Sequence, residues 1–364
     1  MTKHLNQTIR YCTAVDGSSI AWAAIGDGPP LVRCAMANHL GEVLDNPRWA
    51  IAAGLKTIAR GRRLIVYDGR GTGLSDRGFE DLSIESAVDD LMTVVDASGE
   101  ASVSLFADAV GAQPAIAYTA RFPARVARLV LYCGYARGLM RRNPSDQQIA
   151  QREALLAAAL AGWDAPALTF RLLNPSETLP DATPALVSEA AQSMGKEMSG
   201  RVFVRFLRAQ GEADVSELAG RIQVPTLIVQ PTRATRIPFD EGRRLAGLIP
   251  AARLLPVDSA NVVLTASDPG FDAVVATIRE FLAEEEGPMD RGPFAAGLTP
   301  RERDVLELIA RGLDNLQIAA HLNLSEKTIR NNITPIFDKL QVENRAQAIV
   351  KAREAGFGRE GAEG

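Results

Sequence analysis

Residues 102–113 read Ser-Val-Ser-Leu-Phe-Ala-Asp-Ala-Val-Gly-Ala-Gln. An apolar run leads into a short turn at residues 108–111, and a helical pattern follows and ends near Arg121. Because the run carries apolar residues on both faces, it is typical of a strand buried between two layers of helices. A strand, turn and helix in this order predict a mainly parallel sheet.

Similar strand patterns recur along the first three quarters of the chain. We predict further strands at residues 8–13, 20–25, 31–35, 64–68, 129–132, 226–230 and 253–256. The first two are joined by Asp16-Gly17, which favours an antiparallel hairpin. Between residues 136 and 224 helical patterns replace the strands, and this predicts a helical cap over one end of the sheet. Its aromatic residues could line a pocket or only pack the cap: Trp163, Phe170, Phe203 and Phe206.

The boundaries follow from composition. The chain has 364 residues, 46% of them hydrophobic, and a net charge of −4, which suits two globular domains. We expect a sheet domain over 1–285, a linker with two Gly-Pro pairs over 286–296, a small helical domain over 297–358 and a disordered tail over 359–364. The predicted fold class is therefore α/β with a mostly parallel sheet and a helical cap, followed by an all-α domain.

The cysteine count and the absence of long apolar runs bound the remaining classes. The three cysteines form no Cys-x-x-Cys motif, which argues against a disulfide framework and against a structural zinc site. No signal peptide and no membrane-length apolar run is visible. We therefore expect a cytoplasmic protein that needs no metal or cofactor and does not contact a membrane.

Helix start signals organise residues 297–358. Thr299 is a predicted N-cap with Pro300 at the first helical position and Glu302 completing a capping box. Asp314 and Ser325 are predicted to cap the next two helices, and Arg345 begins a fourth. The third of these helices places four apolar residues on one face: Ile329, Ile333, Ile336 and Leu340.

This segment resembles the LuxR/NarL family of helix-turn-helix regulators. The resemblance rests on Leu-Thr-Pro-Arg-Glu-Arg at 298–303, Ile-Ala-Arg-Gly-Leu at 309–313, Gln-Ile-Ala at 317–319, Leu-Ser-Glu-Lys-Thr-Ile-Arg-Asn at 324–331 and Lys-Leu-Gln-Val-Glu-Asn-Arg at 339–345. It implies that the helix from Ser325 enters the major groove of double-stranded DNA. The residues expected to contact DNA are Ser325, Lys327, Thr328, Arg330, Asn331 and Asn332.

Two departures from the family pattern fall in the same helix. Asn332 stands where the family usually has histidine, and Pro335 removes a backbone hydrogen bond and is expected to kink the helix. The domain carries nine Lys and Arg against eight Asp and Glu, so its net charge gives little affinity for DNA. The resemblance therefore implies a homodimer that reads two half-sites, with contacts expected from the last helix at Ala346, Ile349, Val350 and Arg353.

Residues 8–285 resemble the α/β-hydrolase family. The matching pieces are Tyr-Asp-Gly-Arg-Gly-Thr-Gly-Leu-Ser at 67–75, the run from Leu105 to Gly134, Pro-Thr-Leu-Ile-Val at 225–229 and the helical pattern at 271–282. The resemblance implies a sharp strand-to-helix turn that carries a serine nucleophile, with a histidine base and an acid supplied by later loops.

The residues at those three positions do not match the chemistry. The turn Ala-Asp-Ala-Val-Gly puts Ala109 at the nucleophile position, and the family pattern aligns Ala234 with the acid and Asn261 with the histidine. Ala35-Met36 replaces the usual His-Gly of the oxyanion loop. The chain holds only three histidines, at positions 4, 39 and 321, and none follows the last predicted strand.

We therefore predict a regulator that is not an enzyme and whose hydrolase-like domain binds a small, largely apolar effector molecule. The predicted ligand contacts are Met36, Ala37, His39, Asp108, Ala109, Val110, Ala234 and Asn261. Two alternatives stay open: an active hydrolase fused to a DNA-binding domain, with Asp108 as an unusual nucleophile, and a hydrolase-like domain that serves only as a dimerisation scaffold.

Overall fold

The computed structural model describes residues 7–35, 40, 50–78, 81–163, 177–284, 298, 300–322, 326–342, 344–354 and 357. The chain divides into two compact units, Met1–Ala283 and Glu284–Gly364, and each is described by itself. The linker predicted at 286–296 and the tail predicted at 359–364 lie outside the described residues.

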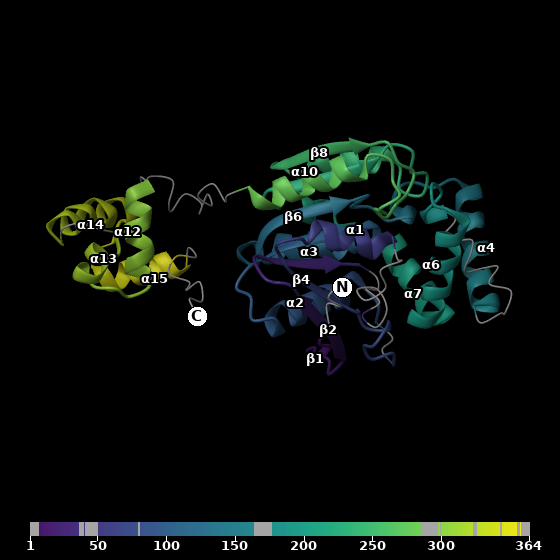
Figure 1. Cartoon of the computed structure of the whole chain (residues 1–364), viewed down its shortest axis with the longest axis horizontal. Coiled ribbons are helices and arrows are strands. Elements are labelled where there is room, and N and C mark those ends of the chain that lie inside the picture. Colours follow the sequence, from purple (N-terminus) through teal and green to yellow (C-terminus); the bar gives the residue numbers. More distant parts are fainter. Residues whose placement is uncertain are drawn as a thin grey trace, which may run out of the picture. The chain divides into compact units, whose positions relative to one another are not determined.

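An eight-stranded sheet forms the centre of the first unit (Figure 1). The strands are ordered β1-β2-β4-β3-β5-β6-β7-β8. Both pairings of β2, with β1 and with β4, are antiparallel, and the remaining pairings are parallel. The predicted mainly parallel sheet and its N-terminal hairpin are confirmed. The strand bounds are β1 Arg10–Thr13, β2 Ser19–Ile25, β3 Pro30–Cys34, β4 Arg63–Tyr67, β5 Val103–Asp108, β6 Val126–Tyr132, β7 Thr226–Pro231 and β8 Ala252–Val257.

Helices cover both faces of this sheet, which explains why the central strands are apolar throughout. One face packs against α2 (Ile84–Ala97), α3 (Ala112–Arg121) and α9 (Phe239–Leu248), with the short α8 (Ser216–Ala219) beside them. The other face packs against α1 (Ala50–Ile58) and α10 (Phe271–Ala283). All six residues of β5 are buried, so its end, where the chain turns into α3, is held rigidly.

Three longer helices between β6 and β7 form the cap and gather at one end of the sheet (Figure 1). They are α4 (Asp146–Gly162), α6 (Pro184–Glu197) and α7 (Gly200–Glu212), and a short 3-10 turn, η3 (Leu139–Arg141), precedes them. Trp163 and Phe203 stack in the cap core with ring centroids 4.8 Å apart, and the indole N–H of Trp163 donates to the Met198 carbonyl at 2.8 Å. Trp163 therefore packs the cap, while Phe170 lies outside the described residues.

The second unit consists of α12 (Pro300–Ala310), α13 (Asn315–Leu322), α14 (Glu326–Leu340) and α15 (Arg345–Glu354) around its own core. Asp314 caps α13 as predicted, because its carboxylate accepts from the Gln317 N–H while the Gln317 side chain accepts from the Asp314 N–H. The helix α14 continues through Pro335, which lies at the exposed surface. The predicted caps Thr299 and Ser325 lie outside the described residues.

No helix within the described ranges is both long enough and apolar enough to cross a lipid bilayer.

Candidate ligand cavity and candidate DNA-reading helix

The turn after β5 has the shape of a nucleophile elbow. Ala109 takes a φ of 45°, a left-handed conformation that a residue with a side chain rarely adopts. Gly111 completes the turn, because a β-carbon there would lie 2.0 Å from the carbonyl oxygen of Cys34 on β3. The strained turn is therefore present, but it presents a methyl group where a hydrolase presents a nucleophile.

The carboxylate of Asp108 is held beside this turn by a buried ion pair. Arg33, from β3, donates to one oxygen of Asp108 through Nη2 at 2.7 Å and through Nε at 3.1 Å. Both side chains are almost fully buried. A carboxylate bound in this way serves as the counter-charge of a guanidinium, which disfavours its use as a nucleophile.

Asn261, at the position expected for histidine, is part of the scaffold. Its side-chain N–H donates to Asp268 at 2.8 Å, and its side-chain oxygen accepts from the Asp181 backbone N–H at 3.0 Å. Asp268 also accepts from the Ser259 hydroxyl and from Thr265. This network ties the loop after β8 to the segment before α6, and it occupies both polar atoms of the amide.

A cavity of about 860 Å³ lies between the elbow and the cap. Among the predicted ligand contacts, Asp108, Ala109 and Val110 line it, whereas Ala234 and Asn261 do not. Met36, Ala37 and His39 lie outside the described residues. Apolar side chains from the cap helices and the loop after β8 form most of the wall: Leu155, Leu156, Leu179, Met194, Met198, Phe203, Leu207, Val262 and Val263.

Three arginines that the sequence analysis did not select also line this cavity. Arg142 follows η3, Arg152 lies on α4 and Arg236 lies in the loop after β7. Burial lowers the pKa of all three guanidinium groups. Their positive charges lower the pKa of Tyr135, another lining residue, but burial has the larger effect and raises this pKa to about 12. The Tyr135 hydroxyl is therefore neutral and can donate a hydrogen bond.

These arginines have few acidic partners in the described part of the chain. The guanidinium of Arg142 stacks 4.8 Å from the Tyr135 ring, and its closest carboxylate, Glu241 at 3.9 Å, is already bound to Arg137 at 2.6 Å. Arg152 forms no ion pair there and donates to the Leu207 carbonyl at 2.6 Å. Arg236 lies 3.7 Å from Glu177, which is largely exposed.

Gln210, on α7, is the second unexpected feature of the wall. It is 3% exposed, it lines the cavity, and neither its side-chain oxygen nor its nitrogen has a hydrogen-bond partner in the part of the chain that the structure describes. The helical spacing of Arg152 and Gln210 could have predicted their place in the wall. Arg152 precedes buried Leu156 and Ala159 by four and seven residues, and Gln210 follows buried Phe203 by seven, so both polar residues lie on apolar stripes.

Within the described ranges, no group of three His, Cys, Asp or Glu side chains gathers closely enough to hold a metal ion. The described part of the cavity wall offers guanidinium, carboxylate, hydroxyl and amide groups beside apolar side chains. Such a set can bind and orient an organic molecule.

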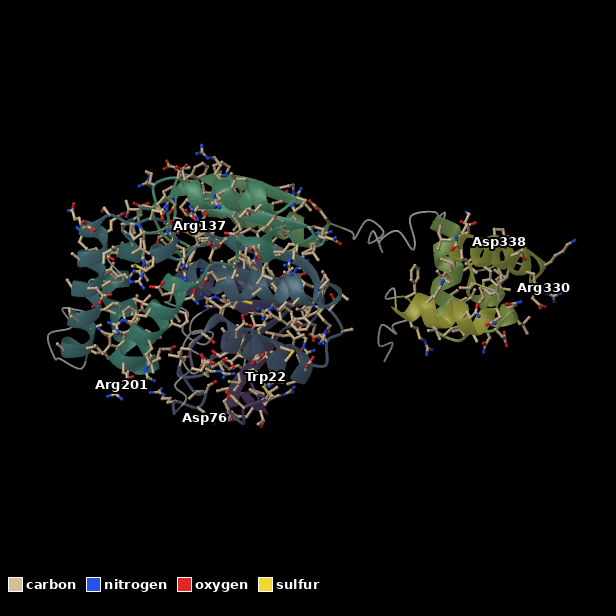
Figure 2. All side chains as sticks on the ribbon, turned by 180° about the vertical axis from the view of Figure 1, so that it is seen from behind. Trp22, Asp76, Arg137, Arg201, Arg330 and Asp338 are labelled. Atoms are coloured by element: carbon tan, nitrogen blue, oxygen red, sulfur yellow. The ribbon has the colours of Figure 1, made fainter. Side chains whose placement is uncertain are left out.

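In the second unit, five of the six predicted DNA contacts lie on α14 (Glu326–Leu340). Lys327 is exposed, and Arg330, whose side chain is 66% exposed, lies at the surface of its unit (Figure 2). Arg330 donates to Glu326 at 2.6 Å, an exposed pair that is easily exchanged for a phosphate or a base. Thr328, Asn331 and Asn332 belong to the same helix, although their side chains are outside the described part, and Ser325 is outside it entirely.

Side-chain contacts that could not be expected from the sequence join the helices of the second unit. The Lys339 ammonium binds both oxygens of Glu302 on α12, at 2.6 and 2.8 Å. Arg345 donates to the Asn315 side chain at 3.1 Å and so joins α15 to α13. In the last helix, Val350 is exposed, whereas the Arg353 guanidinium donates to the Ala310 carbonyl and is less available for a dimer contact.

Comparisons with known families agree with this division of the chain. A family model described as "Bacterial regulatory proteins, luxR family" matches residues 296–352, and a model described as "alpha/beta hydrolase fold" matches residues 40–262, which is more than half of the chain.

Individual relatives match only part of this chain. DesR of Bacillus subtilis, a transcriptional regulatory protein, is 45% identical over 60 residues, which are 16% of this chain and 30% of DesR. An HTH-type transcriptional regulator of Mycobacterium tuberculosis is 30% identical over 141 residues, 32% of this chain and 16% of the relative. The chain thus spans less than a third of the length of these curated relatives.

Among solved structures, an esterase from Exiguobacterium antarcticum superposes with a TM-score of 0.64 at 19% identity. The superposition covers 75% of this chain and all of the esterase. At this identity the likeness establishes the fold of the first unit and leaves its chemistry open.

Proposed function

Because the chain belongs to the α/β-hydrolase fold family and ends in a luxR-type DNA-binding domain, we propose that it is a ligand-responsive transcription regulator. In this proposal the hydrolase-like domain binds a small molecule and does not turn it over. The regulator acts in the cytoplasm as a homodimer on a two-half-site DNA sequence, and the helix α14 reads the major groove of each half-site.

One observation carries the proposal: a cavity of about 860 Å³ opens above an elbow that keeps its strained turn and has lost its nucleophile. Ligands of open α/β sheets bind at the carboxyl ends of the strands, and this cavity lies at that edge, under the cap. Turnover would need a nucleophile and a base. Ala109 supplies no nucleophile, and Asn261 is a neutral amide whose hydrogen bonds are already made.

The coupling between the two units rests on a difference in affinity. A ligand changes DNA binding only if it binds one arrangement of the dimer more tightly than the other. The cap helices and the dimer contact, for which exposed Val350 on α15 is the best candidate, are the elements expected to differ between the two arrangements.

Thermal unfolding of the purified full chain tests the proposal, with a panel of esters, lactones and aromatic and aliphatic acids. A ligand at about one hundred times its Kd should add about 2.7 kcal/mol to the unit that binds it. The same ligand should give no shift with Ala109→Phe or with Ala158→Phe. The second variant fills the cavity from α4, where the backbone is ordinary helix, so it stays informative if the strained position rejects Phe.

Ala109→Ser is the matched control for occupancy of the elbow, because serine is the residue that active members place on this turn. It should keep the thermal shift and should still release no product from 4-nitrophenyl esters. Ester turnover by the native chain that Asp108→Asn abolishes would instead favour an active hydrolase. No shift with any compound would favour a scaffold.

A further inference from the structure

We propose that the ligand of this cavity is an amphipathic carboxylate that carries a hydrogen-bond donor close to its carboxylate group, and that the carboxylate binds among Arg142, Arg152 and Tyr135. The inference rests on the proposed function, because it names the chemical class that the regulatory cavity recognises. It adds a charged group to the largely apolar molecule expected from the sequence.

The charges of the cavity wall indicate that the ligand is an anion. Four arginines and two carboxylates line the described part of the wall, so it holds two positive charges in excess. Arg33 is neutralised by Asp108, and Arg236 has Glu177 nearby. A charge taken out of water is costly unless it is paired. Arg152 forms no ion pair in the described part of the chain, and Glu153 and Glu212 act on it only from a longer distance. An anionic ligand would therefore supply the direct counter-charge.

The guanidinium groups of Arg142 and Arg152 are already fixed in position. Arg152 is held toward Gly211, where a β-carbon would lie 2.1 Å from its Nη2, so the absence of a side chain at Gly211 makes room for the guanidinium. Arg142 is fixed by stacking on Tyr135 and by donating from Nε to the Arg137 carbonyl at 2.7 Å. Guanidinium groups that are already oriented lose little freedom when they bind a carboxylate.

The unpaired amide of Gln210 indicates that the ligand also carries a hydrogen-bond donor. Its nitrogen can donate to a carboxylate oxygen, and the Tyr135 hydroxyl can do the same. Its oxygen can only accept, so it needs a donor that a bare carboxylate or a phosphate does not have. A hydroxyl or N–H group next to the carboxylate would satisfy it, and this requirement favours a hydroxy acid or an acylated amino acid.

The rest of the wall defines the other end of the ligand. Leucine, methionine and phenylalanine side chains from α4, α6 and α7 form much of the remaining wall. An aliphatic or aromatic body fits this lining because it removes apolar surface from water. The charged group of the ligand is thus placed among the guanidinium groups, and its apolar body lies against the leucine, methionine and phenylalanine side chains.

Calorimetric titration of the full chain with three probes tests the inference: 3-hydroxydecanoate, decanoate and methyl 3-hydroxydecanoate. We expect 3-hydroxydecanoate to bind most tightly and the neutral ester to bind at least about tenfold more weakly. Arg152→Gln should weaken binding of the acid about tenfold and leave binding of the ester within about twofold. Arg208→Gln is the matched control, because Arg208 lies on α7, is exposed and pairs with Glu153 outside the cavity.

The outcomes separate this inference from the proposed function. An ester that binds as tightly as the acid would overturn the carboxylate assignment and leave a neutral-ligand regulator in place. If no probe binds while another member of the thermal panel does, the carboxylate assignment likewise fails alone. If Arg152→Gln does not fold, Gln210→Leu serves instead, and it should abolish the preference for 3-hydroxydecanoate over decanoate. A preference that survives Gln210→Leu would refute the role of the amide.

Discussion

Replacement of Gln210 by leucine should make the ligand-free protein more stable. Both polar atoms of the Gln210 amide are buried in α7 without a partner in the described part of the chain, among apolar neighbours such as Phe203 and Leu207. Leucine has a similar volume and a high helix propensity, so Gln210→Leu removes the unsatisfied amide without creating a cavity or weakening the helix.

The magnitude follows from the cost of burying an unpaired polar group, which is about 1–3 kcal/mol. We expect the free energy of unfolding of the first unit to rise by about this amount. In a large domain each kcal/mol shifts the midpoint of thermal unfolding by about 2–4 °C, so the midpoint should rise by at least about 2 °C. A change in this direction is unusual, since most substitutions in a protein core destabilise it.

Urea titration of the ligand-free full chain, followed by circular dichroism, measures the effect. Gln192→Leu is the matched control, because Gln192 lies on the exposed side of α6 and its amide only reaches the Ser188 hydroxyl at 3.5 Å. The control should change stability by less than about 0.5 kcal/mol. If Gln210→Leu lowers stability by 1 kcal/mol or more, on the order of one lost hydrogen bond, then the amide is already satisfied in the free protein and does not await a ligand.

Three further substitutions test other parts of the account. Asp108→Asn leaves the buried Arg33 guanidinium unpaired, so the free energy of unfolding measured by urea titration should fall by about 3–5 kcal/mol. A loss of less than about 1 kcal/mol would contradict a structural role for this ion pair. Arg330→Ala should weaken DNA binding about tenfold at constant salt. Its free energy of unfolding should change by less than about 0.5 kcal/mol, because the pair with Glu326 is exposed. An unchanged DNA affinity would show that Arg330 is not part of the interface. Val350→Glu should convert dimers to monomers in analytical ultracentrifugation, since it places a charge on a side chain that is 56% exposed, and an unchanged dimer would place the contact elsewhere.

The sheet and the elbow could be predicted because local sequence patterns determine them. The apolar run before Asp108 is typical of a buried strand, and Gly111 is needed because the turn packs closely against β3. The order of the strands was less accessible. The antiparallel pairing of β2 with β4 joins segments that are forty residues apart, and no local pattern specifies it.

The polar end of the cavity was missed for a related reason. The sequence places the three arginines in different segments: Arg142, Arg152 and Arg236. Each of them, considered alone, is indistinguishable from an ordinary surface charge. Only the packing of the cap over the sheet brings them to Tyr135. Arg152 could have been noticed from its place on the apolar stripe of α4, where a charged residue needs a partner.

In the proposed regulator, a molecule bound in the cavity changes how the second unit binds DNA. The most direct measurement is the affinity of the full chain for a DNA fragment selected by the protein from a random pool, with and without a saturating ligand from the thermal panel. We expect the ligand to change this affinity by about fivefold or more. Ala158→Phe should remove the change while preserving the ligand-free affinity. Equal DNA affinities with the cavity empty and with the cavity saturated would contradict this proposal.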